Sequence, residues 1–399
     1  MTVPNVAGQA ATVQRLQPFA VNIFAAMSAL AARLEAVNLG QGFPDEDGPP
    51  AMLEAAQQAI AHGVNQYPPG PGILALRQAI AAQRRRAYGM EFDPETGVLV
   101  TVGASEAIAA AVLGLVEPGS DVILIEPAFD TYAPVIAMAG SNRVPVPLVP
   151  DGRGFALDVD ALRAAVTPRT KAIIVNSPHN PTGTVLAEKD LHALAEFAVE
   201  ADLLVISDEV YEHLVYDGRR HLPLATYPGM AERTVTISSA AKMFNCTGWK
   251  IGWACGTPEL IGGVRAAKQY LSYVGGAPFQ PAVAYALESE GAWVAALRSS
   301  LQAKRDKLAA ALTELGFGVH ASAGTYFLCA DPRPLGFSDS ADFCAELPAK
   351  AGVAAIPMSA FCDPATSHAG AWNHLVRFAF CKRDETLDEA IRRLAVLRA

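Results

Sequence analysis

The feature that most constrains the fold is an alternation, in the middle of the chain, between short apolar runs and longer amphipathic stretches. Five short runs are candidate strands, and most of them are apolar at odd and even positions alike: 122–127, 172–178, 203–209, 234–239 and 251–256. Strands have this composition when helices cover both faces of a parallel sheet. Amphipathic stretches such as 187–201 lie between the runs. The pattern therefore predicts a doubly wound α/β domain.

The C-terminal part of the chain follows a different pattern. A long helical stretch at 291–316 leads into two mixed strands, at 325–330 and 373–380, and a closing helix at 384–398. This succession is typical of a smaller α+β unit. Because a chain of 399 residues exceeds what one core usually organises, we expect an N-terminal segment that joins the small domain, a large domain and a small C-terminal domain, at 1–47, 48–288 and 289–399.

Composition limits the possible partners and the compartment. The formal net charge is −9, which argues against nucleic-acid or anionic-membrane binding, since either needs a basic face. The six cysteines form no CxxC pair and the eight histidines no HExxH motif, so we expect reduced thiols and no metal site. No apolar stretch approaches the roughly 20 residues of a membrane span, and no charged and then apolar leader is visible. A cytoplasmic protein is expected.

Polar residues follow three of the predicted strands, at the sheet edge where ligands of such folds bind. In chain order they are Asn180, Asp208, Ser239, Lys242 and Lys250. Asp208 is costly to bury there without a cationic or donor partner. Taken singly, an aspartate after a serine is more often a helix N-cap, and a lysine is more often a surface charge. The set as a whole indicates a shared ligand.

One ligand, pyridoxal phosphate, would use every member of this set. Its aldehyde needs a lysine amine, its ring nitrogen a carboxylate, its phenolate oxygen hydrogen-bond donors, and its phosphate hydroxyls with a cation. A lysine in such a site can have a depressed pKa and attack carbonyls, while the carboxylate keeps the ring protonated as an electron sink. We assign Lys242 to the aldehyde and Asp208 to the ring nitrogen. Tyr211 and Asn180 are assigned to the phenolate oxygen, and Ser238, Ser239 and Lys250 to the phosphate.

Three segments carry a family resemblance. NSPHNPTG (176–183), SDEVYEHLVY (207–216) and SSAAKMFNCTGWKIGW (238–253) resemble the signatures of class I and II aminotransferases, which are pyridoxal-phosphate enzymes of fold type I. The similarity extends from about Leu16 to the end of the chain. It implies a large, doubly wound, mostly parallel sheet domain with a smaller α+β domain. Amino acids and 2-oxo acids are the implied substrates.

The resemblance also implies further site residues and a homodimer. In this family a strand-to-helix turn holds phosphate oxygens through backbone amides, an aromatic ring stacks on the pyridine, and a tyrosine reaches the phosphate of the neighbouring subunit. A glycine segment covers the substrate carboxylate, which an arginine and an asparagine bind. The turn matches Gly103, Ala104 and Ser105, the stacking ring Phe129, and the tyrosine Tyr67. The glycine segment matches Gly42, and the carboxylate-binding pair matches Arg377 and Asn180.

Arg377 is also supported by its own setting. In the predicted strand at 373–380 it shares one face with Leu375 and Ala379. An arginine at the centre of a strand needs an anion, and a carboxylate matches its planar fork. A structural salt bridge is the alternative.

The expected substrate rests on resemblance alone. The chain is most similar to the branch of kynurenine, glutamine and methionine aminotransferases. Within it, the segments at 38–50 and 64–72 resemble N-succinyldiaminopimelate aminotransferases of lysine biosynthesis, so N-succinyl-L,L-diaminopimelate with 2-oxoglutarate is expected. At Gly275 and Gly276 kynurenine-type relatives carry bulkier side chains, which predicts a wider mouth for a long acyl-diamino acid.

Two other classes of function stay open at this point. A carbon–sulfur β-lyase would use the same motifs, because both reactions start from the same lysine-bound cofactor and the same deprotonation. A non-catalytic regulator usually carries a DNA-binding region, for which the residues before the expected fold leave little room. Two further patterns lack their context: Ser239 to Lys242 has no S-D-N or K-T-G companion, and glycine-rich 70–75 follows prolines instead of a strand.

Overall fold

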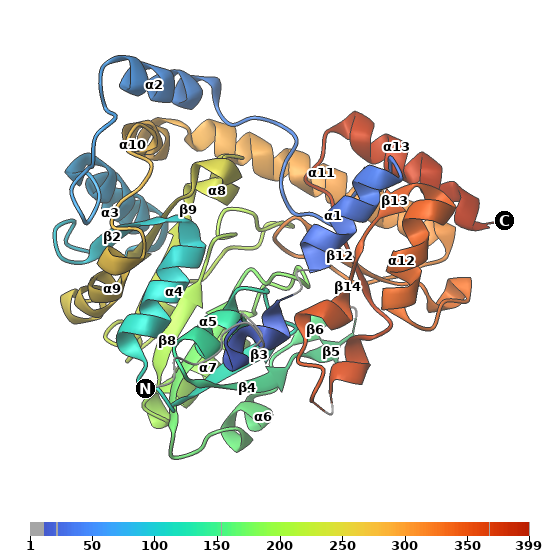
Figure 1. The fold of residues 1–399 in the computed structure, drawn as a ribbon, viewed down its shortest axis with the longest axis horizontal. Helices are drawn as coiled ribbons and strands as arrows, with labels where there is room; N and C mark the ends of the chain where they lie inside the picture. The colour runs from blue at the N-terminus through green and yellow to red at the C-terminus, as the bar shows by residue number, and fades with distance from the viewer. Residues whose placement is uncertain (1–11, 21–22, 153, 367, 399) are drawn as a thin grey trace, which may run out of the picture.

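The computed structural model describes residues 12–20, 23–152, 154–366 and 368–398 (Figure 1). Its centre is a seven-stranded sheet in which β10 is antiparallel to both neighbours and the other neighbouring strands are parallel. All five predicted strands are present, and the α/β fold class is confirmed. In spatial order the strands are β2 (Val98–Val102), β10 (Ile251–Cys255), β9 (Thr234–Ser239), β8 (Leu204–Asp208), β7 (Thr170–Asn176), β3 (Asp121–Glu126) and β4 (Asn142–Pro147).

Helices on both faces explain why these strands are apolar at every position. In β3, Val122 and Leu124 belong to one buried cluster, whereas Ile123 and Ile125 belong to another on the opposite face. The first face is covered by α4 (Gly103–Leu115), α5 (Tyr132–Met138) and α9 (Pro258–Leu271). The second face is covered by α2 (Pro50–Ala61), α3 (Leu74–Tyr88), α7 (Glu188–Glu200) and α10 (Phe279–Ser289).

A second, antiparallel sheet contains β11 (Gly318–Val319), β12 (Phe327–Asp331), β15 (Val376–Ala379) and β14 (Ile356–Pro357), in that spatial order. The helices beside it are α11 (Gly291–Leu315), α12 (Ser340–Ala351) and α13 (Asp384–Leu394). The N-terminal segment joins this part: β1 (Val37–Asn38) pairs with β13 (Val353–Ala354), and α1 (Ile23–Arg33) lies near α12 (Figure 1). Domain limits at 47 and 288 stay a prediction.

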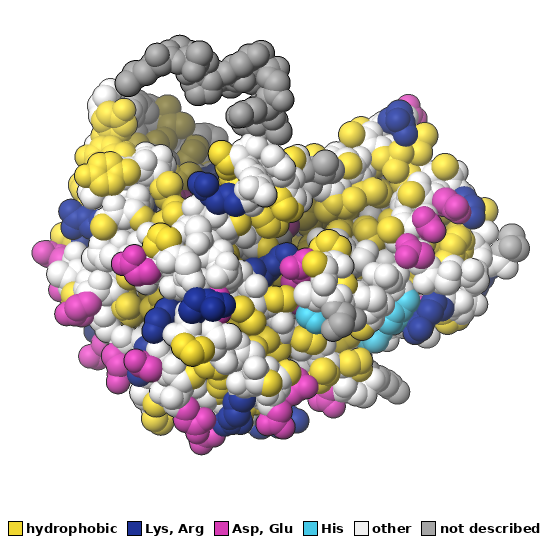
Figure 2. Space-filling model, turned by 60° about the horizontal axis from the view of Figure 1, so that its bottom comes forward, with side chains coloured by type: hydrophobic (Ala, Val, Ile, Leu, Met, Phe, Trp, Pro, Cys, Tyr) yellow, Lys and Arg dark blue, Asp and Glu magenta, His cyan; other side chains and the backbone are white. Residues whose placement is uncertain are grey.

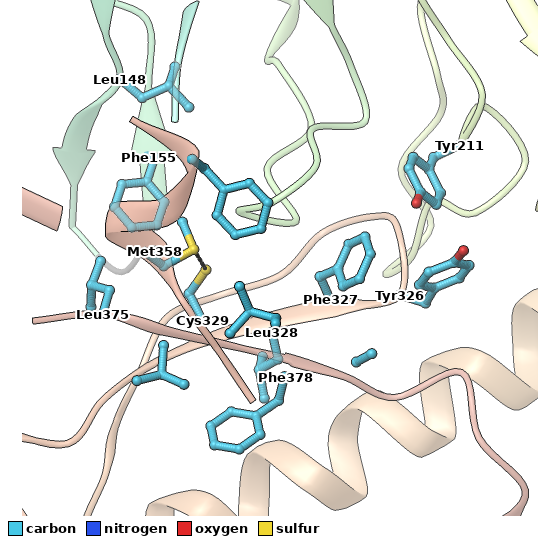
Figure 3. Close-up of a cluster of buried hydrophobic side chains, with 14 of the residues drawn as sticks. Leu148, Phe155, Tyr211, Tyr326, Phe327, Leu328, Cys329, Met358, Leu375 and Phe378 are labelled. Atoms are coloured by element: carbon cyan, nitrogen blue, oxygen red, sulfur yellow. Dashed lines mark hydrogen bonds between the residues drawn. The ribbon is translucent and has the colours of Figure 1, made fainter. Parts of the chain in front are cut away.

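A small hairpin that follows β4 forms a two-stranded sheet of its own. It contains β5 (Val149–Asp151) and β6 (Gly154–Ala156) and is followed by α6 (Val159–Ala164). One apolar cluster joins this hairpin and both sheets, and it includes Val205, Leu328 and Phe378, none more than 1% exposed. Figure 3 shows part of it, with Tyr211 and Tyr326 facing each other at a ring distance of 5.2 Å. Because such interiors are close-packed, the ends of β8 and β12 are held in a fixed relation.

A fully buried ion cluster lies next to the end of β8. Arg84 of α3 pairs with Glu209 at 3.0 Å and with Glu212 at 2.9 Å, and none of the three side chains is more than 1% exposed. Ser207 donates a hydrogen bond to Glu209 at 2.9 Å, and Ser238 donates one to Glu212 at 2.6 Å. Burial is the largest single effect and would raise the pKa of Glu212, but Arg84, His213, His221 and the Ser238 hydroxyl together outweigh it and lower this pKa to about 2. The cluster therefore fastens α3 to the ends of β8 and β9.

Replacing Arg84 should test this cluster. Arg84→Met keeps much of the side-chain volume but leaves Glu209 and Glu212 buried without their cation, a change that costs about 3–5 kcal/mol. We expect a loss of this size in the free energy of unfolding, measured by urea denaturation with circular dichroism. The control is Arg85→Met, at an exposed position of the same helix, which should stay within about 0.5 kcal/mol of the wild type. Equal stability of both variants would contradict the role of the cluster.

Candidate active site

A cavity of about 400 Å³ lies at the carboxyl ends of β7, β8 and β9, and residues of β12 and β15 line its other side. The position agrees with the rule that ligands bind at this edge of open α/β sheets. All predicted site residues except Tyr67 and Ser238 line it: Gly42, Gly103, Ala104, Ser105, Phe129, Asn180, Asp208, Tyr211, Ser239, Lys242, Lys250 and Arg377.

Lys242 lies in α8 (Ala240–Met243), directly after β9. Its Nζ donates a hydrogen bond to Tyr326 Oη at 2.7 Å. The amine also lies over the rings of Tyr211 and Tyr326, at 5.6 and 5.3 Å from their centroids. Burial lowers the pKa of this lysine to about 8. Because the neutral amine is the form that attacks a carbonyl, Lys242 is suited to bond an aldehyde near neutral pH.

Asp208 is the last residue of β8 and is only 3% exposed. Its carboxylate accepts hydrogen bonds from Tyr132 Oη at 2.6 Å and from Val210 N at 3.2 Å. Burial raises its pKa to about 6, although these hydrogen bonds act in the opposite direction. Both donors are neutral, so a protonated ring nitrogen would supply the positive partner that a buried carboxylate requires.

The first turn of α4 and Lys250 form one end of the cavity. Gly103 opens this helix with a φ of +71°, and a Cβ added there would lie 3.1 Å from Lys250 Nζ. A Cβ on Gly252 would lie 2.5 Å from the carbonyl carbon of Gly103, so this glycine lets β10 approach the helix closely. An ammonium group beside a helix N-terminus is a suitable site for a phosphate.

Only one of the two serines at the end of β9 lines the cavity. Ser239 does so, whereas Ser238 donates its hydroxyl hydrogen to Glu212 at 2.6 Å, within the buried ion cluster. Successive side chains of a strand point to opposite faces, so two adjacent serines cannot both reach one ligand. The prediction that Ser238 helps to bind the phosphate is therefore wrong.

Arg377 occupies the side of the cavity formed by β15 and is 1% exposed. Its Nη1 donates to Asn180 Oδ1 at 2.8 Å and its Nη2 to Gly40 O at 2.7 Å. Both acceptors are uncharged oxygens, so these contacts differ from the structural salt bridge that was the alternative. Arg377 Nε has no hydrogen-bond partner among the described residues, and burial lowers the pKa of the guanidinium to about 10. A substrate carboxylate would satisfy this group.

Two tyrosines that touch the central groups were not singled out in the sequence. Tyr132 donates to Asp208 and Tyr326 accepts from Lys242. Tyr132 lies three residues after Phe129, across the turn that leads into α5, and their rings pack edge to face at 5.6 Å. Tyr326 gave no signal in the sequence, because it precedes a strand of the second sheet.

Tyr67 lies outside the cavity of its own chain. Its side chain is 83% exposed and packs edge-on against Tyr273, with ring centroids 5.7 Å apart. The role expected of Tyr67 concerns the site of a neighbouring subunit. That role stays a prediction.

The expected wide mouth is not found at Gly275 and Gly276. A Cβ on Gly275 would lie 2.7 Å from Val102 Cγ2, and a Cβ on Gly276 would lie 2.3 Å from Ile251 Cδ1. Gly276 also has a φ of +62°, which favours glycine over other residues. These glycines allow close packing onto β2 and β10, so the prediction that they widen the mouth is wrong.

The groups that converge on this cavity fit pyridoxal 5′-phosphate. An amine, a carboxylate, a phenol, an amide and a hydroxyl line one space, with an anion site at one end and an arginine at another. The cradle at Gly103 is open because the Cβ that would fill it is missing. A large, mostly parallel sheet with this donor set at its carboxyl edge defines the pyridoxal-phosphate enzymes of fold type I.

Comparison with known proteins identifies the family. Residues 35–394 match aminotransferase class I and II, and the chain belongs to this family. A probable N-succinyldiaminopimelate aminotransferase of Mycobacterium tuberculosis, DapC, is 76% identical over 390 residues, 97% of this chain and 98% of the relative. The methionine aminotransferase of Escherichia coli is 38% identical over 383 residues, 96% of this chain and 97% of the relative.

Solved structures agree with this result. The structure of N-succinyldiaminopimelate aminotransferase from Mycobacterium tuberculosis matches with a TM-score of 0.95, at 76% identity, and covers 97% of this chain and 100% of that chain. The protein is therefore an aminotransferase that depends on pyridoxal phosphate, as the sequence motifs predicted.

The remaining surface carries mixed charge. Acidic and basic side chains are interspersed over the face shown in Figure 2. Within the described ranges, no helix is both long and apolar enough to cross a membrane. The same residues contain no group of three or more histidine, cysteine or acidic side chains arranged to hold a metal ion. All six cysteines are buried and none forms a disulfide.

The lowered pKa of Lys242 predicts how cofactor uptake depends on pH. Below pH 8 most of the amine is protonated, so the rate at which the apoprotein takes up added pyridoxal phosphate should rise about ten-fold per pH unit and level off above pH 8. Stopped-flow absorbance measures this rate. After borohydride treatment, Lys242→Arg should carry no covalently bound cofactor. The control Lys171→Arg, at an exposed position, should carry as much as the wild type. A midpoint at the ordinary lysine value of 10.5 would contradict the effect of burial.

Proposed function

We propose that this chain moves the amino group between the glutamate/2-oxoglutarate pair and N-succinyl-L,L-diaminopimelate, with glutamate as the amino donor in lysine biosynthesis. The observation that carries amino transfer is the presence of Lys242, Asp208 and Arg377 around one cavity. The choice of substrate is supported by the 76% identity to the probable N-succinyldiaminopimelate aminotransferase over 97% of this chain.

The proposed roles of the residues follow from their positions. When bound, pyridoxal phosphate supplies an aldehyde that receives the amino group and a ring that withdraws electrons from the substrate Cα. Arg377 and Asn180 bind the substrate α-carboxylate, and the backbone around Gly42 covers it. Lys242, as a neutral amine, removes the proton from the substrate Cα. It then returns this proton to the carbon on the opposite side of the transferred nitrogen. Asp208 holds the proton of the ring nitrogen.

The other predicted residues hold the cofactor in place. Tyr211, with Asn180, donates hydrogen bonds to the phenolate oxygen, and Phe129 stacks on the ring. The phosphate is held at the first turn of α4, by Gly103, Ala104 and Ser105, together with Ser239 and Lys250.

A second candidate substrate class is favoured by a specific observation. The cavity wall near Arg377 includes the apolar rings of Phe24 and Phe327, which suit an apolar amino-acid side chain. The methionine aminotransferase of Escherichia coli is 38% identical to this chain. Methionine and kynurenine are therefore the substrates to compare, and a carbon–sulfur β-lyase remains the alternative reaction.

We also infer a homodimer with shared sites, located in the cytoplasm. Tyr67, Tyr270 and Tyr273 are 83%, 86% and 48% exposed, and Tyr67 contacts Tyr273. Soluble monomers seldom leave large aromatic side chains grouped on the surface, and such groups mark interfaces. The net charge of −9 and the six unpaired cysteines favour a cytoplasmic location.

A substrate panel tests the proposed reaction. With 2-oxoglutarate as acceptor, kcat/KM for N-succinyl-L,L-diaminopimelate should exceed that for methionine or kynurenine by about 100-fold or more, since the acyl-diamino acid makes additional contacts. Glutamate formation is the readout, and Lys242→Ala should give no turnover with any substrate. Release of ammonia and pyruvate from a cysteine conjugate, without glutamate, would indicate the β-lyase instead.

Mixing two variants tests the shared site. Tyr67→Ala and Lys242→Ala should each have little activity alone. After subunit exchange, half of the dimers in an equal mixture are hybrids, and each hybrid has one site with both residues intact. The mixture should therefore recover about a quarter of the wild-type activity. If the mixture has only the average activity of its two components, Tyr67 acts within its own chain or not at all.

A further inference from the structure

The hydroxyl of Tyr326 lies between the amine of Lys242 and the backbone of Gly42. Lys242 Nζ donates to Tyr326 Oη at 2.7 Å, and Tyr326 Oη donates in turn to Gly42 O. Tyr326 is 1% exposed, and it comes directly before β12 of the second sheet. This one hydroxyl therefore connects three distant parts of the chain at the cavity.

The directions of these hydrogen bonds follow from the hydrogens available. A phenol has one hydrogen, and a backbone carbonyl can only accept it, so the lone pairs of Tyr326 Oη face Lys242. Burial raises the pKa of Tyr326 well above its usual value, so the phenol keeps its hydrogen. A neutral amine has two hydrogens and one lone pair. With one N–H held by Tyr326, the lone pair of Lys242 is free to face the cavity.

The segment that accepts this hydrogen also contacts the arginine of the carboxylate site. Arg377 Nη2 donates to Gly40 O at 2.7 Å. The segment is tightly packed, since a Cβ on Gly42 would lie 2.3 Å from Phe327 Cζ and a Cβ on Gly40 would lie 3.1 Å from Ile356 Cδ1. Tyr326 and Arg377 are therefore linked through two carbonyl groups of one short, closely packed segment.

We propose that Tyr326 is a positioning residue, whose hydroxyl holds the Lys242 amine at the position from which it removes the substrate proton. Tyr326 itself neither gives nor takes a proton, because its hydrogen stays in the bond to Gly42 O; the proton that leaves Cα is accepted by the amine. The same contact fixes the amine relative to a carboxylate bound at Arg377. This inference rests on the proposed function in that a proton must leave the substrate Cα.

Tyr216 provides a matched control. It is also 1% exposed, and its hydroxyl donates to the backbone oxygen of Thr325. Neither tyrosine is among the residues that line the cavity, but Tyr326 contacts Lys242. Tyr326→Phe and Tyr216→Phe thus each remove one buried hydroxyl and leave one backbone carbonyl without its donor. Only the first variant removes a group that contacts Lys242.

The first measurement is steady-state kinetics of the holoenzymes. General-base catalysis contributes about 10²–10⁴-fold, so a poorly held amine in Tyr326→Phe should lower kcat about ten-fold or more. The KM for the amino donor should change less than about three-fold, because the carboxylate site is intact. Tyr216→Phe should keep the wild-type kcat and KM. A kcat for Tyr326→Phe equal to that of Tyr216→Phe would overturn the proposal.

The second measurement uses the apoproteins and needs no substrate. The pH dependence of Lys242 acetylation by acetic anhydride, followed by mass spectrometry of its peptide, should have a wild-type midpoint near 8. Tyr326→Phe should lower this midpoint, because the ammonium loses an oxygen acceptor that stabilises its charge. An unchanged midpoint would also overturn the proposal. If the proposed function fails instead, all three holoenzymes lack transfer while the acetylation difference persists.

Discussion

The ion cluster of Arg84, Glu209 and Glu212 determines how the central strand ends, and one whole side of the cavity depends on that end. Within 207–212 the side chains diverge: Asp208 and Tyr211 line the cavity, while the two glutamates face Arg84 at 2.9–3.0 Å. Burying two carboxylates side by side is costly unless a cation lies this close to both. Glu209 directly follows Asp208, and Glu212 is four residues away. The ion pairs that hold the two glutamates therefore also hold the backbone that carries the Asp208 carboxylate.

The two central ionisable groups of the site are matched to a ligand that carries the complementary chemistry. Burial raises the pKa of Asp208 from 3.8 to about 6, so folding favours its protonated form, and its contribution to stability is lost as the pH rises from 4 through 6. A cationic ring nitrogen would reverse this loss, which links cofactor binding to stability above pH 6. Burial lowers the pKa of Lys242 to about 8, and a covalent bond to an aldehyde removes the need for its charge.

The sequence predicted the site well where its residues share a strand end, and poorly where tertiary packing decides. Asp208 and Lys242 follow apolar strands, so their place at one sheet edge could be inferred from the alternation alone. The hydroxyl of Ser238 faces away because register along β9 sets its direction. Gly275 packs closely against Val102 of β2, which is distant in the sequence. Tyr326 contacts Lys242 from the second sheet. The sequence around a residue does not predict such distant contacts.

A chain of amides connects the two ends of the site. Arg377 donates to Asn180 Oδ1 at 2.8 Å, Asn180 N donates to Asn176 Oδ1 at 2.8 Å, and Asn176 Nδ2 donates to Asp208 O at 2.9 Å. Arg377 and Asp208, at opposite ends of the site, are therefore held by one network of hydrogen bonds. A reactive site needs groups that are held in place in this way. The rings of Phe24 and Phe327 lie 5.2 and 3.9 Å from Arg377 Cζ but take no part in these hydrogen bonds. These wall residues can therefore change without removing a hydrogen bond from the network that holds Arg377 and the end of β8.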